Sequence, residues 1–316
     1  MMTLPDFKEK QILFVQAERG KDNFLKFKND NILYRKDEEN IDMISCHKVF
    51  AVFVVGDFSI TTTLIRNCER YGISLFLLNN NFKVYARINS RLDGNYMLRE
   101  RQYKFNDELV VAKKLVKNKA YNQLSLLKER KKLKCFEKEL KAVYEKIDKT
   151  KANKELLGVE GGISKNFFSR YFSEMNWLRR MPRAKYDVNN VLLDIGYTFA
   201  FNFVDSLLNL YGFDVYKGFY HKLFFQRQSL SCDLVEPFRC LIDRQLLKSF
   251  RLGQINENDF DYIGGKYVLT YGKQRKYLKI FFDCLLKRKV EIFLYVKGFY
   301  CFMMRDNKNF PFFKIK

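Results

Sequence analysis

Histidine is scarce in this chain, which has only His47 and His221 among its 316 residues. No second histidine lies near His221, so a zinc site built on two histidines is not indicated. The seven cysteines are odd in number and include no Cys-x-x-Cys pair, which argues against a zinc ribbon or a disulfide framework. The sequence also has no phosphate-binding loop, no dinucleotide fingerprint and no G-x-S-x-G nucleophile motif.

Long hydrophobic runs are missing as well. The N-terminus MMTLPDFKEK has no basic-then-apolar signal pattern, and apolar runs such as Val49–Val55 are far too short to span a bilayer. No predicted helix pairs a large apolar face with a purely basic one, which makes a membrane-surface role the weakest possibility. We therefore predict an intracellular, cytoplasmic protein with reduced thiols and no membrane partner.

Acidic residues are few relative to basic ones. The chain has 58 Lys and Arg against 36 Asp and Glu, a formal net charge of +22, while 47% of its residues are hydrophobic. Enough apolar residues are present to bury real cores, so the chain is not a disordered basic tail. The charge excess favours a polyanionic partner, nucleic acid first, although a generally basic solvated surface would also account for it.

The first hundred residues have the pattern of short strands. Segments rich in Val, Ile, Phe and Tyr alternate with Gly, Asn and Asp turns, and Asn80-Asn81 is suited to a hairpin turn. One helix is expected at 59–72, with Ser59 as its N-cap and Gly72 at its end. We read His47 as structural, because no partner ligands lie near it.

From about residue 95 the pattern becomes helical. Residues 96–150 contain no Pro and no Gly, a strongly apolar helix is expected from Asn189 to about Tyr211, and two amphipathic helices flank Arg288. We predict an α+β protein with an N-terminal β-rich domain containing one helix (1–95, for dimerisation or partner docking). A larger all-α domain (96–316) follows and carries the metal site.

The stretch from His221 to Arg239 holds the most informative polar residues. If the segment from about Ser231 is helical, Asp233 and Glu236 lie one turn apart on the same face and could bind a cation together with His221. The same residues also fit a helix start, with Asp233 as N-cap and Glu236 at the third helical position. Glu160, in a Gly-containing turn expected before a helix, could be a further ligand or a first-turn Glu favoured by the helix dipole.

Taken together, these side chains suit metal-assisted phosphoryl transfer in a basic protein. Carboxylates can hold a hard cation that activates an attacking oxygen and neutralises charge on the transition state. Spacing alone does not separate this hypothesis from a structural role.

Several motifs occur in an order that is more specific than any one of them. The chain resembles the CRISPR-associated spacer-acquisition integrase family, the metal-dependent DNA integrases and endonucleases of CRISPR adaptation. The resemblance covers nearly the whole chain and rests on Gly56…Ser59-Ile60-Thr61-Thr62, Gly72-Ile73-Ser74-Leu75-Phe76, Gly158-Val159-Glu160-Gly161, Asn190-Val191-Leu192-Leu193, Gly218-Phe219-Tyr220-His221 and Asp233-Leu234-Val235-Glu236-Pro237-Phe238-Arg239.

The resemblance implies a site and partners. Glu160, His221 and Glu236 match the family's metal ligands, with Glu236 where other members have Asp, and Asp233 matches an auxiliary acid. The cofactor is then Mg²⁺ or Mn²⁺, and one imidazole beside two carboxylates suits Mn²⁺ at least as well as Mg²⁺. The implied partners are double-stranded DNA, both short prespacer fragments and the CRISPR repeat, a second copy in a homodimer, and a small adaptation protein that bridges two dimers.

DNA contacts are expected mainly with the phosphate backbone. The expected contact residues are cations in a loop without acids and in two further segments: Arg179, Arg180, Arg183, Lys185, Arg227, Lys273, Arg275 and Lys276. Tyr197 and Trp177 could stack on bases but are interpreted as core. Two other functions remain open, a stand-alone structure-specific DNA nuclease and a non-catalytic DNA-binding scaffold.

Overall fold

The structure is a computed structural model that describes residues 3–79, 82, 84–88, 95–222, 224–304 and 309–316. The chain divides into two compact units, of which unit 1 comprises Met1–Tyr96 and Asp205–Phe213. Unit 2 comprises Met97–Val204 and Asp214–Lys316. Helix α7 (Val188–Tyr211) contributes residues to both units. The two units therefore cannot be separated by cutting the chain at a single point.

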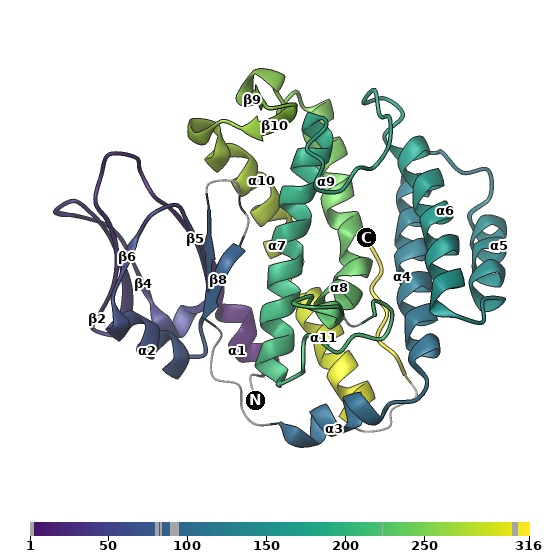
Figure 1. Ribbon diagram of the computed structural model, residues 1–316, viewed down its shortest axis with the longest axis horizontal. Helices are drawn as coiled ribbons and strands as arrows, with labels where there is room; N and C mark the ends of the chain where they lie inside the picture. Colours follow the sequence, from purple (N-terminus) through teal and green to yellow (C-terminus); the bar gives the residue numbers. More distant parts are fainter. Residues whose placement is uncertain (1–2, 80–81, 83, 89–94, 223, 305–308) are drawn as a thin grey trace. The chain divides into compact units, whose positions relative to one another are not determined.

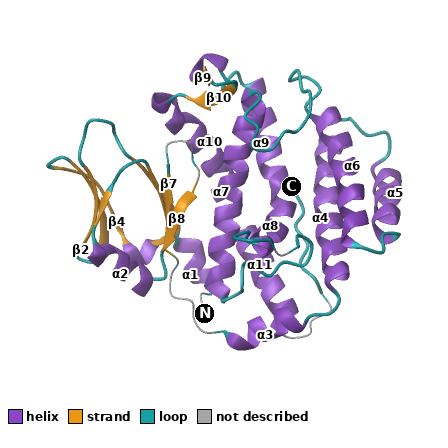
Figure 2. Ribbon diagram, in the orientation of Figure 1, coloured by secondary structure: helices purple, strands orange, loops and turns teal. Residues whose placement is uncertain are grey.

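Unit 1 contains two four-stranded sheets (Figure 2). In the first, the strand order is β1-β5-β7-β8, and only the β7–β8 pair is antiparallel. In the second, the order is β4-β3-β2-β6, with β6 parallel to β2. The strands are β1 (Gln11–Gln16), β2 (Asn23–Lys28), β3 (Asn31–Lys36), β4 (Glu39–Ser45), β5 (Val49–Val55), β6 (Ser59–Ile60), β7 (Ser74–Leu78) and β8 (Val84–Ile88).

The core of unit 1 forms around β5, in which every residue is buried. Such a continuous apolar run is typical of a central parallel strand that is covered on both faces. Helix α2 (Thr62–Arg70) packs into this core through Leu64 and Cys68, and the short helix α1 (Leu4–Glu9) buries Phe7. A β-rich N-terminal region is therefore confirmed, with α1 as a second helix.

Two local expectations in unit 1 change. Ser59 belongs to strand β6, and the N-cap of α2 is Thr61, whose hydroxyl accepts a hydrogen bond from the Leu64 N–H. Gly72 follows the helix at φ +69°, as expected for a left-handed stop. The predicted Asn80-Asn81 turn lies outside the described residues. His47 packs edge-on against Tyr71, in keeping with a structural residue.

Unit 2 is mainly helical (Figure 1). Its helices are α3 (Tyr96–Lys104), α4 (Glu108–Glu129), α5 (Phe136–Asp148), α6 (Asn153–Tyr171), the first part of α7, α8 (Ser229–Val235), α9 (Arg239–Arg251), α10 (Gln274–Leu286) and α11 (Lys289–Met304). The helical prediction is confirmed, but the region is not entirely α. A two-stranded antiparallel hairpin, β9 (Phe260–Ile263) with β10 (Lys266–Leu269), lies between α9 and α10.

Helix α7 is apolar because it is a core helix. Among the described residues it is the one helix long and apolar enough to cross a membrane, yet 83% of its most apolar window is buried inside the protein. Gly196 permits close packing here, since a Cβ would lie 2.4 Å from Ile242 of α9. Gly212, at φ +83°, ends the helix as its position predicted.

Helix α4 organises the part of unit 2 that contains the candidate site. It packs against α5, α6 and the 3₁₀ turn η2 (Glu236–Phe238). Asn118 and Asn122 on its buried face hydrogen-bond the extended C-terminal tail at Phe313 and Ile315. Asn122 also donates to the Pro237 carbonyl at 3.1 Å, so this helix fixes the backbone directly beside Glu236.

Candidate metal centre and nucleic-acid interface

Glu160 lies in the middle of α6, and not in a turn or first helical turn as the glycines around it suggested. A Cβ at Gly158, Gly161 or Gly162 would meet no atom within 4 Å, so these glycines do not mark a close approach. The apolar side of the helix is held by Leu156, Phe167, Phe168 and Tyr171, which are buried. This packing offsets the cost of about 1 kcal/mol for each helical Gly relative to Ala.

Asp233 is not a helix N-cap. Helix α8 begins at Ser229, with Gln228 at the N-cap position, so Asp233 lies inside the helix and is fully buried. Its carboxylate accepts backbone hydrogen bonds from Phe219 (2.6 Å), Tyr220 (2.9 Å) and His221 (2.9 Å). Gly218 is required beside it, because a Cβ there would lie 2.8 Å from Asp233 Oδ2.

The same carboxylate fixes the ring of His221. Asp233 Oδ1 lies 2.7 Å from His221 Nδ1, which leaves Nε2 as the nitrogen available to a ligand. A carboxylate that holds one imidazole nitrogen and orients the other is a common support for a metal-binding histidine. Asp233 thus contacts the predicted ligand His221, and its auxiliary role stays a prediction.

Glu236 begins the 3₁₀ turn after α8 and is only 6% exposed. Its carboxylate pairs with Arg239 at 3.0 Å and with Lys119 Nζ at 2.6 Å. The contact of the buried Oε2 with Lys119 is an ion pair without hydrogen-bond geometry. Burial alone would raise the pKa of Glu236, but the charges of Arg239 and Lys119 outweigh it and lower the pKa to about 2. Glu236 is therefore ionised. It is the first residue of η2, in which no side chain makes a capping hydrogen bond.

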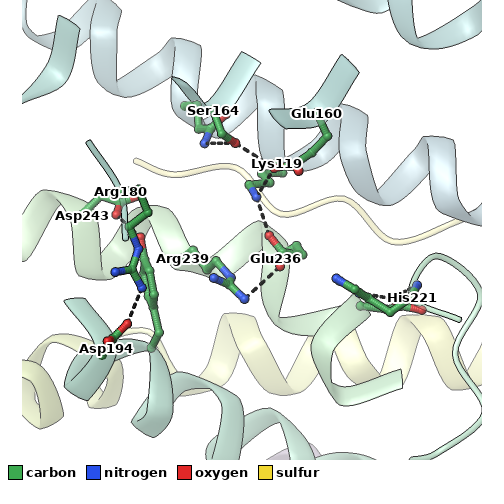
Figure 3. Close-up of polar contacts among 12 residues, drawn as sticks. Lys119, Glu160, Ser164, Arg180, Asp194, His221, Glu236, Arg239 and Asp243 are labelled. Atoms are coloured by element: carbon green, nitrogen blue, oxygen red, sulfur yellow. Dashed lines mark hydrogen bonds and ion pairs between the residues drawn. The ribbon is translucent and has the colours of Figure 1, made fainter. Parts of the chain in front are cut away.

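Lys119, from the middle of α4, joins the two glutamates (Figure 3). Its Nζ lies 2.5 Å from Glu160 Oε1 and 2.6 Å from Glu236 Oε2, and the Ser164 hydroxyl also donates to Glu160 Oε1 at 2.7 Å. Burial opposes the charge of Lys119, but the two glutamates raise its pKa above the ordinary value. We call Lys119, Glu160, Glu236 and Arg239 the carboxylate cluster.

These contacts bear on the predicted ligands. Figure 3 shows His221 beside Glu236, and the His221 ring contributes to the electrostatic environment of that carboxylate. Within the described ranges, no three His, Cys, Asp or Glu side chains are grouped as a ready-made metal site. The ammonium of Lys119 lies between the two carboxylates. Glu160 and Glu236 nevertheless converge on one cationic atom, and this donor set, with one imidazole, suits a hard divalent ion.

Sequence reasoning missed Lys119, although a signal existed. Asn118, Asn122 and Gln123 form a buried polar group on α4, in a helix whose other buried side chains are mostly apolar. Buried polar side chains at a spacing of three or four residues indicate a helix face that meets polar groups.

A second polar cluster lies next to the first. Tyr197 of α7 donates a hydrogen bond to Asp243 of α9, and the guanidinium groups of Arg180 and Arg239 lie over the Tyr197 ring at 5.4 and 4.8 Å from its centroid. Burial raises the pKa of Asp243 to about 7, although Tyr197 and nearby cations oppose the rise. We call Tyr197, Asp243 and Arg180 the tyrosine cluster. Tyr197 is 7% exposed, as expected for a core residue.

The predicted basic loop is not free of acids in three dimensions. Arg180 donates to Asn190 Oδ1 at 2.7 Å and pairs with Asp194, both on α7. Asp194 also accepts the Arg183 N–H at 2.8 Å. Arg180 therefore fastens the loop to α7, which corrects the expectation that the whole loop is unneutralised. Trp177, before the loop, stacks on Phe168 and belongs to the aromatic core.

The other predicted cations differ in how they are engaged. Lys276 pairs with Asp259 at 2.8 Å, and Lys273 lies 3.8 Å from the same carboxylate, so both are partly neutralised. Arg275 is exposed. In the basic loop, Arg179 and Arg183 are exposed and Lys185 is half-buried, unlike the tethered Arg180. Arg227, which lies outside the loop, is also exposed.

Two aromatic side chains near His221 were not singled out from the sequence. Phe224 is 73% exposed and Phe225 is 84% exposed. Neighbouring Lys222 and Arg227 are exposed cations. Exposed rings flanked by cations are typical of surfaces on which unpaired bases stack.

The same fold, a β-rich unit joined to a mainly helical one, occurs in solved structures of a Cas1 protein and of a casposase. A solved structure of a Cas1 protein from Thermotoga maritima has a TM-score of 0.83 at 20% identity, with 97% of this chain and 100% of that chain covered. A casposase bound to integration product has a TM-score of 0.82 at 21% identity, with 95% and 92% covered. At these identities, the likeness shows the fold alone.

The family model described as CRISPR associated protein Cas1 matches residues 19–282, and this chain belongs to that family. A CRISPR-associated endonuclease Cas1 from Thermodesulfovibrio yellowstonii is 29% identical over 245 residues, which cover 72% of this chain and 77% of that protein. One from Moorella thermoacetica is 25% identical over 300 residues, with 85% and 87% covered. The predicted family and its enzyme class, the endonucleases and integrases of CRISPR adaptation, are confirmed.

Proposed function

We propose that this chain joins the 3′-OH ends of short DNA fragments to a CRISPR repeat by transesterification, at a metal centre held by Glu160, His221 and Glu236. The observation that carries the proposal is the convergence of Glu160 and Glu236, from α6 and η2, on one cationic atom, with His221 near enough to contribute to the electrostatic environment of Glu236. Mg²⁺ or Mn²⁺ bound there would activate the attacking oxygen and neutralise charge on the phosphodiester in the transition state.

The chain's own residues prepare the centre. Arg239 and the backbone around Pro237, held by Asn122, keep Glu236 in place. Asp233 holds the His221 ring through Nδ1, which leaves Nε2 available to a ligand. Because Asn122 and Asp233 are buried on helices, these supports position the donor atoms before substrate arrives. If water replaced the 3′-OH as the attacking group, the same centre would hydrolyse DNA.

The DNA interface in this proposal comprises the predicted cations and the two exposed rings. Arg179, Arg183, Lys185, Arg227 and Arg275 would contact phosphates, with smaller contributions from Arg180, Lys273 and Lys276, which already have acidic partners. Phe224 and Phe225 offer surfaces for unpaired bases.

Relatives support a proposal for assembly and location. A solved Cas6-RT-Cas1–Cas2 complex contains a chain with this fold, at a TM-score of 0.79. We propose that this chain forms homodimers, that a small adaptation protein bridges two of them, and that the assembly works in the prokaryotic cytoplasm.

The decisive experiment is an integration assay with a labelled short duplex and a repeat-bearing plasmid, run in Mn²⁺, Mg²⁺ and EDTA. Joined strands that require metal and disappear in Glu160→Gln, His221→Ala and Glu236→Gln support the proposal. Glu174→Gln is the matched control, because Glu174 is a surface acid that pairs with Arg251. Hydrolysed ends without joined strands would assign a structure-specific nuclease instead.

A non-catalytic scaffold is the second candidate, and Lys119 is the observation that favours it. An ammonium between two glutamates is also what a purely structural ion-pair network contains. In that case, the three variants of the proposed ligands would leave metal-dependent DNA processing unchanged.

A further inference from the structure

The position of Lys119 is unusual for a lysine. Its side chain is only 14% exposed, and the side chains of Glu160 and Glu236 that it contacts are 17% and 7% exposed. Lysine ammonium groups normally stay in water, and a surface pair contributes little to stability. A largely buried ammonium held by two carboxylates therefore indicates a specific requirement for positive charge at this point.

The charges of the carboxylate cluster balance only when Lys119 is included. Glu160 and Glu236 contribute two negative charges, while Lys119 and Arg239 contribute two positive ones. Arg239 pairs with Glu236 alone, so Lys119 is the cation that the two carboxylates share. Without it, two largely buried carboxylates would face each other, and like charges at short range repel strongly where water is excluded.

The oxygens that share Lys119 belong to the two carboxylates proposed as metal ligands. Lys119 Nζ contacts Glu160 Oε1 and Glu236 Oε2, which are the atoms that converge in this structure. Mg²⁺ binds oxygen ligands at about 2.0–2.1 Å. A metal ion bound to both oxygens would need the space that the Lys119 ammonium fills, so the two cations exclude each other.

We propose that Lys119 is a positioning residue that serves as a built-in counter-cation: it holds Glu160 and Glu236 together in the metal-free protein and leaves the space between them when a divalent metal binds. Lys119 thereby weakens metal binding and stabilises the metal-free fold. This inference rests on the proposed metal centre, and it adds that Lys119 competes with the metal for the two carboxylates. A lysine can play this part because its ammonium sits on a flexible four-carbon stem that can swing away without a change in α4.

The test compares Lys119→Met with Lys117→Met. Lys117 lies on the same helix but pairs with Asp148, of which 56% is exposed, so its replacement should leave the centre unchanged. Mn²⁺ affinity is measured by titration calorimetry, and melting temperatures are recorded in EDTA and in saturating Mn²⁺. We expect Lys119→Met to bind Mn²⁺ at least about tenfold more tightly, since a competing charge is gone. We also expect its melting temperature to be lower than that of the wild type in EDTA. Saturating Mn²⁺ should raise its melting temperature by more than it raises that of the wild type.

Lys119→Gln keeps a hydrogen-bond donor without the charge and provides a second variant if Lys119→Met does not fold. Unchanged or weaker Mn²⁺ binding in the folded variant would overturn the inference. Failure of the metal centre itself would be seen separately. If Glu160→Gln and Glu236→Gln bind Mn²⁺ as well as the wild type does, the metal is not held there, whatever the Lys119 variants show.

Discussion

The carboxylate cluster and the tyrosine cluster use buried acids in opposite ways, although Arg239 contacts both. Glu236 has two cationic partners, and its pKa falls to about 2. Asp243 accepts a hydrogen bond from Tyr197, and burial raises its pKa to about 7. Burial disfavours the charged form in both cases, so the difference comes from direct ion pairs with cations.

The comparison shows which acid is suited to hold a cation. A carboxylate that is ionised at every physiological pH, and that is paired with a lysine on a flexible side chain, can exchange the ammonium for a metal. A carboxylate close to its titration midpoint, with a phenol as its direct partner, is better suited to hold two helices together. Asp243 joins α9 to α7 through Tyr197 in this way. The experiments below separate the two roles.

The largest effect is expected in the pH dependence of stability at Asp243. Its pKa is about 7 in the folded protein and near 3.8 without the fold, so folding takes up a proton between these pH values. Stability from this group is complete below about pH 4 and falls as pH rises towards 7, by up to about 4 kcal/mol for a shift of this size. Asp243→Asn should lack this slope. Urea denaturation at several pH values between 4.5 and 7.5 measures it, and parallel curves for the two proteins would refute the expectation.

The next largest effect separates the clusters by activity. Glu236→Gln should lower metal-dependent strand joining by more than ~100-fold, beyond the 10–100-fold that loss of a supporting residue costs. Asp243→Asn, isosteric and neutral like the protonated acid, should stay within a few-fold of wild type near pH 7. Initial rates of strand joining in Mn²⁺ measure the loss in each variant. Equal losses in the two variants would mean that Asp243 also belongs to the reacting centre.

Much of the fold could be predicted from the sequence, because its patterns are local. The buried strand β5, helix α7 with its stop at Gly212 and the helices flanking Arg288 follow from periodicity and glycine alone. The β9–β10 hairpin was missed, since its strands are only four residues long and their pairing has few buried side chains. Glu160 was placed in a turn because glycines were taken as breakers, whereas packing of α6 overrides their propensity.

The candidate site was predictable only in part. His221, Asp233 and Glu236 are close in sequence, so their grouping could be inferred from spacing. Whether Asp233 caps its own helix or accepts hydrogen bonds from the 219–221 backbone depends on where α8 begins, which spacing does not decide. Lys119 enters from α4 by tertiary packing, and the polar residues beside it on α4 indicate a polar face without identifying its partners.

A smaller loss is expected for the support of the histidine. Asp233→Asn keeps the shape of the side chain but removes the charge that favours a proton on His221 Nδ1. We expect activity and Mn²⁺ affinity to fall about 10–100-fold, the range for such supporting residues. Asp148→Asn is the control, because it makes the same substitution at an exposed acid that pairs with Lys117. Wild-type Mn²⁺ affinity in Asp233→Asn would show that the ring is held by other contacts.

The smallest effect distinguishes two neighbouring arginines of the basic loop. Arg179 is exposed, whereas Arg180 is bound to Asn190 and Asp194 and lies over Tyr197. Each phosphate contact adds a slope of about −0.9 to the dependence of log affinity on log salt, so Arg179→Gln should reduce the slope by roughly that amount and weaken binding a few-fold. Arg180→Gln should lower the melting temperature instead and leave the slope nearly unchanged. Fluorescence anisotropy of a labelled duplex between about 30 and about 300 mM salt, one decade, measures both. If the slope falls only in Arg180→Gln, the ion pair with Asp194 opens on DNA, and the two arginines exchange the roles that their contacts assign to them.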